Sequence, residues 1–543
     1  MRKLFYGGDI LTLGEDEPYT GAVLTDNRRI IMTGTLSEVS EYAKNGDCER
    51  IDLEGGTLIP GFIDPHSHFT QVAYSFLEVS LDGACTAAEM RARIEAFIKE
   101  RNVSPGEWIN ANEYDNNSLP GAVHLPLSEI DALAPGYKLV IRHKSGHMGL
   151  FNSSALAALG IGPDTPDPEG GRIGRESGKL TGYVEENAFF EYLRKIPAYK
   201  PEQLLDGCIK AQQLYASYGI TTLQDGMVVQ EMLPLYQMLL ERGVPYLDFV
   251  LYASPECYEK AAKLTEEFPK GRFRVGGMKI FLDGSPQGRT AWMRTPYLGE
   301  PAGYRGYGTM TDREVEAAME YSAEKKTQLI AHCNGDAAVE QFLRCLEKTE
   351  EKYPLLRSLK PVIIHAQLIG RDQLVRAAEL GAMASFFVAH VYHWGDVHIR
   401  NFGADRAASI SPSFSAKRAG LTFTFHQDSP VIRPDMLETV WCAVSRVTRG
   451  GVKLGANEAI GVYDALSAVT LNGAIQYGEE HLKGSISAGK FADLAVLSKN
   501  PLKCRHPEEI RDIKVLKTYK EGNQVFDGEE AYSVKDILHC VRI

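Results

Sequence analysis

The spacing of hydrophobic positions changes repeatedly along the middle of the chain. Segments with an apolar residue at every third or fourth position, which are typical of amphipathic helices, alternate with short apolar runs that are typical of buried strands. This alternation indicates parallel strands joined by crossover helices. The predicted helices span residues 200–219, 231–243, 257–268, 311–326, 337–353 and 371–381.

The predicted strands span residues 57–68, 220–226, 246–254, 275–285, 328–336, 362–369, 382–390 and 421–430. They end near His68, Asp225, Ser254, Asp283, His332, His365, His390 and Asp428. Eight such strands are the number that closes a (β/α)8 or TIM barrel. We therefore expect an α/β fold in which residues 57–474 form the barrel.

The two ends of the chain have a different pattern from the middle. Residues 1–56 and 475–543 contain short β-like pieces broken by glycine, asparagine and aspartate turns. We expect both ends to form one composite domain, a small β-sandwich.

One predicted connection is far longer than a normal βα loop. Residues about 75–190 separate the first two predicted strands, and they contain a predicted helix at 87–102 and strand-like pieces at 108–116 and 138–152. We expect an inserted subdomain over the mouth of the barrel. A separate domain with its own activity is the alternative.

Composition narrows the class of partner. Hydrophobic residues make up 44% and charged residues 24% of the chain, as in ordinary globular proteins. The formal net charge of −12 and the lack of a lysine or arginine block argue against nucleic acid and anionic membranes as partners. We expect a small-molecule substrate, with a homodimer as the default assembly.

Cysteine usage and apolar run lengths bear on the compartment. The nine cysteines are scattered and form no Cys-x-x-Cys pair, so neither a disulfide framework nor a zinc knuckle is indicated. The first residues do not resemble a signal peptide. No run reaches the roughly 18 apolar residues of a membrane helix. We expect a cytoplasmic protein.

Side chains that can bind a metal gather at the carboxyl ends of the predicted strands, where TIM barrels build their active sites. His66 and His68 lie two residues apart, so in an extended strand both imidazoles share a face. The other strand-end candidates are Lys279, His332, His365 and Asp428. One strand-end histidine alone is more often structural. Together the set predicts a catalytic centre that holds zinc or another divalent metal and retains water.

Lys279 needs a separate explanation because an ammonium group cannot ligate a cation. Burial beside metal ions favours loss of its proton. The free amine can then react with carbon dioxide to give a carbamate that bridges two ions. Alternatively, Lys279 is an ordinary lysine that pairs with Asp283 or holds a substrate carboxylate.

Five motifs occur in a fixed order along the chain: GFIDPHSHF, MKIFLDGS, IAHCNGD, VIIHAQ and FHQDSPV. In this order they resemble the amidohydrolase superfamily. Longer segments are similar to its amidohydrolase-3 or YtcJ-like branch, which includes N-substituted formamide deformylase: HKSGHMGLFNSSAL, GGRIGRESGKLTGYVEENA, DGSPQGRTAWM, SPVIRPDMLETVWCAVSR and LNGAIQYGEEHLKGSISAGKFADLAVL. The resemblance covers nearly the whole chain.

The resemblance implies a metal-bearing (β/α)8 barrel beside a small β-sandwich. It implies that His66, His68 and Asp428 bind the more buried metal and that His332 and His365 bind the second. Lys279 stands at the place of the bridging lysine in two-metal members, so one or two zinc ions are expected.

The implied reaction is hydrolysis of a C–N bond by metal-activated hydroxide, with Asp428 as the base. An N-substituted formamide or an N-acyl amine is the expected substrate. A cyclic amide, carbamate or ester is the alternative substrate, and a non-catalytic interaction protein is the alternative from another class.

Substrate contacts are expected from two further segments. His143 and His147 belong to the inserted segment, and Arg289 and Trp292 follow the fourth predicted strand. Both groups could face the barrel mouth, although a structural role suits each equally well. The histidines at 390, 393 and 398 form a cluster without an assigned role.

Overall fold

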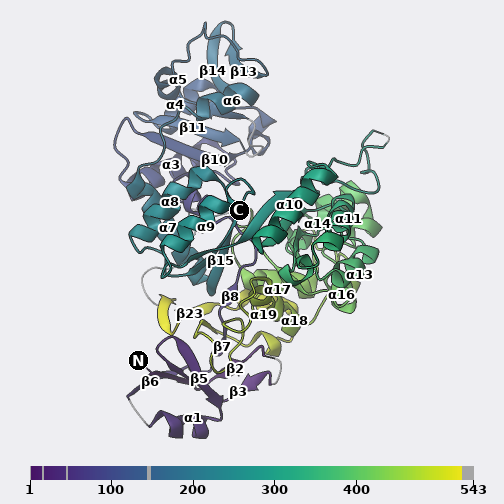
Figure 1. The fold of residues 1–543 in the computed structure, drawn as a ribbon. Helices are drawn as coiled ribbons and strands as arrows, with labels where there is room; N and C mark the ends of the chain where they lie inside the picture. Colours follow the sequence, from purple (N-terminus) through teal and green to yellow (C-terminus); the bar gives the residue numbers. More distant parts are fainter. Residues whose placement is uncertain (1, 15–16, 45–46, 144–147, 302, 529–543) are drawn as a thin grey trace. The chain divides into compact units, whose positions relative to one another are not determined.

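The computed structural model describes residues 2–14, 17–44, 47–143, 148–301 and 303–528 (Figure 1). The described chain divides into two compact units, residues 2–69 with 212–528 and residues 70–211. Helices α2 (Phe69–Ser75) and α7 (Pro201–Ser217) lie at the boundaries between these units.

A curled sheet of eight parallel strands forms the centre of the first unit. Its strands, in sheet order, are β8 (Phe62–Ile63), β15 (Ile220–Val228), β16 (Asp248–Ala253), β17 (Phe273–Phe281), β18 (Gln328–Cys333), β19 (Val362–His365), β20 (Met383–Phe386) and β21 (Phe423–Phe425). Strand order follows chain order, as in a TIM-barrel α/β fold. The expected barrel class is confirmed.

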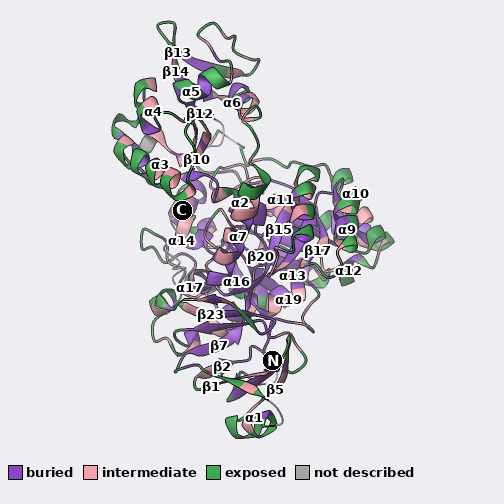
Figure 2. Ribbon diagram, turned by 90° about the vertical axis from the view of Figure 1, so that its left-hand side faces the viewer, coloured by how far each residue is buried: buried purple, intermediate pink, exposed green. Residues whose placement is uncertain are grey.

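Helices follow the strands, as the alternating pattern predicts. They are α8 (Leu233–Glu241), α9 (Tyr258–Glu267), α10 (Asp312–Lys325), α11 (Asp336–Lys352), α12 (Leu356–Leu359), α13 (Arg371–Glu379), α14 (His390–Phe402), α15 (Ala404–Ala407), α16 (Ser413–Arg418), α17 (Met436–Ser445), α18 (Val462–Ala468) and α19 (Leu471–Gln476). Short 3-10 turns are η3 (Gln230–Met232), η4 (Ala456–Glu458), η5 (Pro501–Lys503) and η6 (Pro507–Asp512). Figure 2 shows buried residues along the central strands and exposed residues on the outer faces of α9 and α10.

The pair α10 and α11 illustrates why these segments are helical. Thr311 caps the start of α10 in a capping box with Glu314, which satisfies backbone N–H groups that would otherwise have no partner. In α11 the buried residues Phe342 and Leu343 lie three and four positions after the buried Val339. They form one apolar stripe that packs inward.

The first predicted strand, residues 57–68, is two strands in different sheets. β7 (Thr57–Pro60) pairs with strands from the chain ends, and only β8 joins the barrel sheet. The change occurs at Gly61, where a Cβ atom would lie 2.5 Å from the Thr221 side chain. The seventh barrel strand also differs from its predicted end, because it stops at Phe386 and His390 begins α14.

Strands from both chain ends lie together (Figure 1). A six-stranded sheet has the order β24 (Asn523–Asp527), β23 (Val515–Lys520), β22 (Leu494–Leu497), β7, β2 (Asp9–Leu11) and β3 (Tyr19–Thr20). A four-stranded sheet has the order β5 (Arg29–Gly34), β4 (Ala22–Asp26), β1 (Arg2–Tyr6) and β6 (Cys48–Asp52), with α1 (Leu36–Ala43) against it. Phe5 and Val23 of the smaller sheet share one hydrophobic cluster with Leu58 and Leu494 of the larger sheet.

The second unit, residues 70–211, includes the long segment of residues 75–190 between the first two predicted strands. Its sheet has the order β13 (Gly171–Glu176), β14 (Lys179–Glu185), β12 (Met148–Phe151), β11 (Lys138–His143), β10 (Trp108–Tyr114) and β9 (Val79–Ser80). Its helices are α3 (Ala87–Arg101), α4 (Leu127–Leu133), α5 (Ser153–Ala158) and α6 (Glu186–Leu193), with 3-10 turns η1 (Asn116–Ser118) and η2 (Pro120–Ala122). The unit has two hydrophobic clusters of its own.

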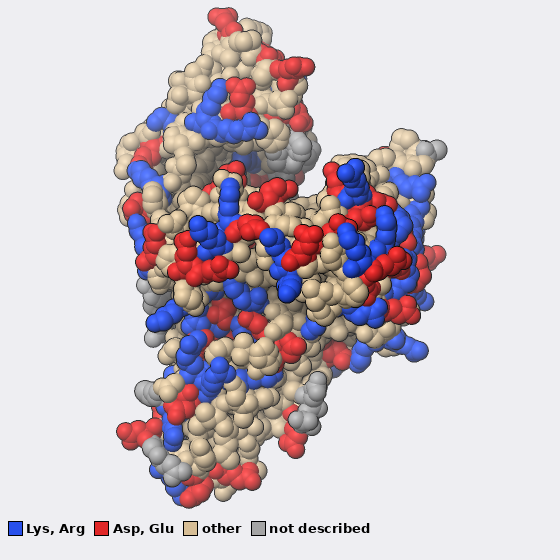
Figure 3. All heavy atoms as spheres, viewed as in Figure 1, with Lys and Arg blue, Asp and Glu red and all other residues tan. Residues whose placement is uncertain are grey.

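On the face seen in Figure 3, acidic and basic side chains of the described residues are interspersed. Within the described ranges, the helices are too short or too polar to cross a membrane.

Candidate metal centre

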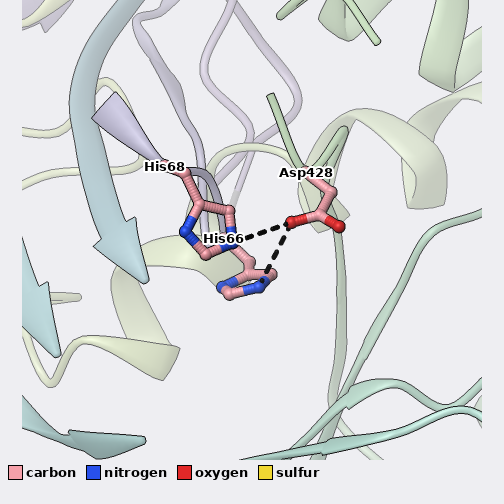
Figure 4. A group of neighbouring side chains, drawn as sticks. All are labelled: His66, His68 and Asp428. Atoms are coloured by element: carbon pink, nitrogen blue, oxygen red, sulfur yellow. Dashed lines mark ion pairs between the residues drawn. The ribbon is translucent and has the colours of Figure 1, made fainter. Parts of the chain in front are cut away.

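Three predicted ligands from the first and last barrel strands meet at one point (Figure 4). His66 and His68 follow β8, and Asp428 follows β21. The Oδ1 atom of Asp428 lies 3.4 Å from Nε2 of His66 and 3.3 Å from Nε2 of His68. One nitrogen from each histidine and one carboxylate oxygen therefore lie within 4.8 Å of one another.

The backbone around this group is held in an uncommon conformation. The His68 N–H donates to the Ser429 carbonyl at 2.8 Å, which joins the segments that follow the two edge strands of the barrel. Asp428 has φ 56° and His365 has φ 69°, both in the left-handed region. Non-glycine residues occupy this region at an energetic cost and do so preferentially at functional sites.

The remaining predicted ligands lie beside the first three. Nζ of Lys279 on β17 is 3.3 Å from Nε2 of His66. Nε2 of His365 on β19 lies 3.0 Å from Nδ1 of His332 on β18. The imidazole rings of His66 and His365 have their centroids 5.6 Å apart. All six predicted ligands thus belong to one cluster at the carboxyl ends of the barrel strands.

Gln224 fixes which nitrogen of His66 faces the cluster. Its amide Nε2 donates to the Pro65 carbonyl at 2.6 Å, so its Oε1 is left as the acceptor 2.6 Å from Nδ1 of His66. Nδ1 of His66 therefore carries the proton. The Nε2 lone pair of His66 is free to point at the cluster, which is the arrangement found in metal-binding histidines.

Similar contacts orient His332 and His365. The Gly284 carbonyl, which can only accept, lies 3.1 Å from Nε2 of His332, and the Asn334 amide, which donates to the same carbonyl, lies 3.0 Å from that nitrogen. When Nε2 of His332 also donates to Gly284, its Nδ1 keeps a lone pair. Nδ1 of His365 lies 3.1 Å from Nε2 of His426, whose Nδ1 is 2.8 Å from the Ser385 hydroxyl. When each ring donates outward along this chain, the Nε2 lone pair of His365 also faces the cluster.

His426 is the site residue that the sequence reasoning missed. It is fully buried, and its ring centroid lies 5.2 Å from that of His66. The sequence pattern that could have identified it is its position two residues before Asp428, because His66 and His68 have the same spacing. Its contact with His365 gives it a supporting role in the cluster.

Burial favours the neutral forms of His66, His332 and His365, and the surrounding histidines favour the charged form of Asp428. Burial, with help from Lys279, lowers the pKa of His332 to about 4, and burial holds the pKa of His66 and His365 well below the usual value. Burial also lowers the pKa of Lys279 to about 7. Burial alone would raise the pKa of Asp428, but His68 and the neighbouring histidines hold it well below its usual range.

These donors fit a divalent metal ion. Asp428 Oδ1 is buried and accepts no hydrogen bond of normal geometry from the described residues, an arrangement that costs free energy unless a cation or water satisfies the oxygen. Neutral imidazole nitrogens and one carboxylate oxygen are the ligand types of catalytic zinc sites.

Comparison with known families agrees with this geometry. Residues 49–526 match the model of the amidohydrolase family. The chain belongs to the amidohydrolase family. This amidohydrolase is 28% identical over 543 residues to N-substituted formamide deformylase of Arthrobacter pascens, an alignment that covers 96% of this chain and 98% of the relative. It is 26% identical over 542 residues to YtcJ of Bacillus subtilis (strain 168), and this alignment covers 97% of this chain and 100% of YtcJ.

A solved structure shares the fold. The crystal structure of an uncharacterised metal-dependent hydrolase from Pyrococcus furiosus superposes with a TM-score of 0.75 at 23% identity, and the match covers 93% of this chain and 100% of the other. Family membership makes the protein a hydrolase, and the predicted resemblance to the amidohydrolase-3 or YtcJ-like branch is confirmed.

The predicted substrate contacts of this amidohydrolase stay predictions. The Arg289 guanidinium binds Glu300 and donates to Asn401 at 3.0 Å, and the backbone N–H of Trp292 donates to Asp283 at 2.9 Å. These contacts tie the loop after β17 to its surroundings. His143 ends β11 in the unit of residues 70–211, and His147 lies outside the described residues.

Proposed function

We propose that this amidohydrolase is a metal-dependent enzyme that cleaves the C–N bond of a small amide, with an N-substituted formamide or N-acyl amine as substrate. The observation that carries the proposal is the inward-facing set of donors on His66, His68 and Asp428. Their positions at the strand ends match the usual place of TIM-barrel active sites.

The ligands divide into two groups. His66, His68 and Asp428 would hold one divalent ion, for which zinc is the first choice, and His332 with His365 would hold a second. When bound, such an ion acidifies water and polarises a carbonyl group.

Asp428 is the group that moves the proton. Its carboxylate is ionised at neutral pH, so it can accept a proton from the attacking water and deliver it to the leaving nitrogen. An amine leaves poorly unless it is protonated, which makes a carboxylate beside the water necessary.

Lys279 has the properties that carbamate formation requires. With a pKa of about 7, a large fraction of its side chain is a free amine at neutral pH. The amine nitrogen attacks carbon dioxide, and one proton is released as the carbamate forms. The alternative pairing with Asp283 is disfavoured because that carboxylate already accepts backbone N–H groups from Trp292, Asn334 and Gly335.

Phe281 supports a substrate with an apolar substituent. It lies two residues beyond Lys279 on β17, so both side chains share a face of the strand. The residue is 37% exposed, and the centroid of its ring lies 5.3 Å from that of His332. An exposed aromatic ring beside the donor cluster suits an aryl or alkyl group on the amide nitrogen. The relative from Arthrobacter pascens is named N-substituted formamide deformylase, after a substrate of this class.

The test combines metal analysis with a substrate panel. Protein purified without chelators would be analysed for metal and assayed with N-benzylformamide, N-butylformamide, N-benzylacetamide, a cyclic amide, a carbamate and an ester. We expect about two zinc ions per chain and fastest hydrolysis of a formamide. Preference for the cyclic amide, carbamate or ester would move the substrate to that class.

The Lys279→Ala variant separates one metal from two. If Lys279 bridges two ions, the variant loses bound metal and activity together, and a short carboxylate such as acetate restores part of both. If a single metal persists with activity, Lys279 is a structural or substrate-binding residue. A wild-type protein without metal or activity would favour the non-catalytic alternative.

A further inference from the structure

His390 and His398, which the sequence left without a role, form a buried pair beside the donor cluster. His390 is the first residue of α14, just beyond the carboxyl end of β20. Its Nδ1 lies 3.0 Å from Nε2 of His398, and the planes of the two rings are nearly parallel, 10° apart. His390 is 4% exposed and His398 is fully buried.

One aromatic ring, that of Phe387, lies close both to this pair and to the histidines of the metal centre. The centroid of Phe387 lies 4.5 Å from that of His390, 5.4 Å from that of His426 and 6.4 Å from that of His365. Burial lowers the pKa of His390, whereas the charge on Asp428 acts in the opposite direction, which places His390 within electrostatic reach of the site.

The surroundings of His398 determine which of its two ring nitrogens carries the proton. Its Nδ1 is buried and has no hydrogen-bond partner among the described residues. Burial lowers the pKa of His398 to about 4, so the ring is neutral and carries one N–H at neutral pH. If that proton were on Nδ1, a buried donor would be unpaired, which is rarer in proteins than an unpaired acceptor. The proton therefore belongs on Nε2, and His398 donates to Nδ1 of His390.

The same reasoning fixes His390. Because Nδ1 of this neutral ring accepts from His398, its own proton is on Nε2. Within the described chain Nε2 has no hydrogen-bond partner, and it is not among the fully enclosed polar atoms. His390 therefore presents a free N–H donor at the carboxyl end of the barrel strands.

We propose that the Nε2–H group of His390 donates a hydrogen bond to the carbonyl oxygen of the substrate, and that His398 is the positioning residue that holds His390 in this tautomer. The inference rests on the proposed amide hydrolysis, in which negative charge develops on that oxygen as its carbon becomes tetrahedral. A preorganised donor stabilises the transition state, in which this charge develops, more than it stabilises the ground state. Removal of one such donor typically lowers kcat about 10²- to 10³-fold.

The first experiment tests the tautomers without reference to activity. Neutron diffraction from deuterium-exchanged crystals of the full chain should show deuterium on Nε2 of both His390 and His398 and none on either Nδ1. Deuterium on Nδ1 of His390 would overturn the assignment. This result stands whether or not the enzyme hydrolyses an amide.

The second experiment tests the role in turnover, with the most active amide of the panel. His390→Phe should lower kcat about 100-fold or more with little change in KM and with unchanged metal content and Tm. His390→Gln, which keeps an N–H donor, should recover at least tenfold of that loss. His398→Phe should lower kcat with KM unchanged, and His398→Gln should restore part of it.

His393 provides the matched control on the same helix. It binds Glu438 at 2.9 Å and makes no hydrogen bond to His390 or His398, so His393→Gln should keep kcat within threefold. If His390→Phe also kept kcat within threefold, the proposed donor role would be wrong while amide hydrolysis stood. A wild type inactive on every amide would instead remove the proposed function, and the substrate role of His390 with it.

Discussion

Nδ1 of His66 lies 2.6 Å from Oε1 of Gln224, and both side chains are buried. Gln224 is itself fixed by donating to the Pro65 carbonyl and to the Tyr477 hydroxyl. The orientation of the first predicted metal ligand is thus determined by Gln224 on β15, which is not one of the predicted ligands.

Replacing Gln224 tests this relationship. Gln224→Leu removes the acceptor, so His66 can turn or change tautomer, and metal affinity should fall about 10- to 100-fold. Competition with a chelator of known affinity measures the change. The control is Gln341→Leu, which removes a buried glutamine that binds Met310 and Asp312 on the outer helices. That variant should lose stability and keep its metal affinity; equal losses of affinity would contradict the role of Gln224.

Asp428→Asn should separate proton transfer from metal binding. The amide oxygen can still act as a ligand, but it cannot accept the proton of water, so kcat should fall about 10²- to 10⁴-fold. Metal content in excess zinc should remain close to that of the wild type. Near-normal turnover with metal bound would show that another group is the base.

The buried charges near the chain ends should contribute strongly to stability. Asp248 at the start of β16 lies 2.5 Å from Nζ of Lys483 and 2.6 Å from Nζ of Lys520, and both lysines are almost fully buried. Asp248→Ala leaves two buried ammonium groups without this partner, so the free energy of unfolding should fall by about 3–5 kcal/mol.

Denaturant unfolding measures that loss. The pair Asp464 and Lys417, 2.7 Å apart and more exposed than Asp248 and its lysines, is the control, because Asp464→Ala should cost less than about 1 kcal/mol. A loss of the same small size for Asp248→Ala would mean that the buried charges are solvated in another way.

Asp435 predicts a pH dependence of stability. It caps the N-terminus of α17, and burial raises its pKa from 3.8 to about 6. The folded state therefore binds more protons than the unfolded state between these values, so the contribution of Asp435 is fully present below pH 3.8 and is lost as the pH rises through about 6.

Asp435→Asn removes the cost of the buried charge and keeps a capping oxygen. At pH 7.5 the variant should be more stable than the wild type, by up to about 3 kcal/mol at 1.36 kcal/mol for each pKa unit. At pH 4 the two proteins should unfold at nearly the same denaturant concentration. A stabilisation that is equal at both pH values would exclude the charge as its cause.

The sequence by itself determined the barrel class and predicted six residues that the structure then places in one cluster. Strand and helix periodicities are local properties, and in a parallel barrel every strand end lies on the same face, so His66, Lys279 and Asp428 could be placed together without knowing their contacts. The motif order also gave the family.

Only the tertiary structure decided the contacts that depend on register and side-chain orientation. The break at Gly61 arises because β7 pairs with strands from the chain ends, and no local pattern encodes a partner so distant in sequence. The link from Gln224 to His66 spans 158 residues and the link from His426 to His365 spans 61. Such contacts select one tautomer and one direction for each ring. Spacing along the chain cannot select a tautomer or a ring direction. It determines which strand end carries a residue, but not which atoms of other residues contact its side chain.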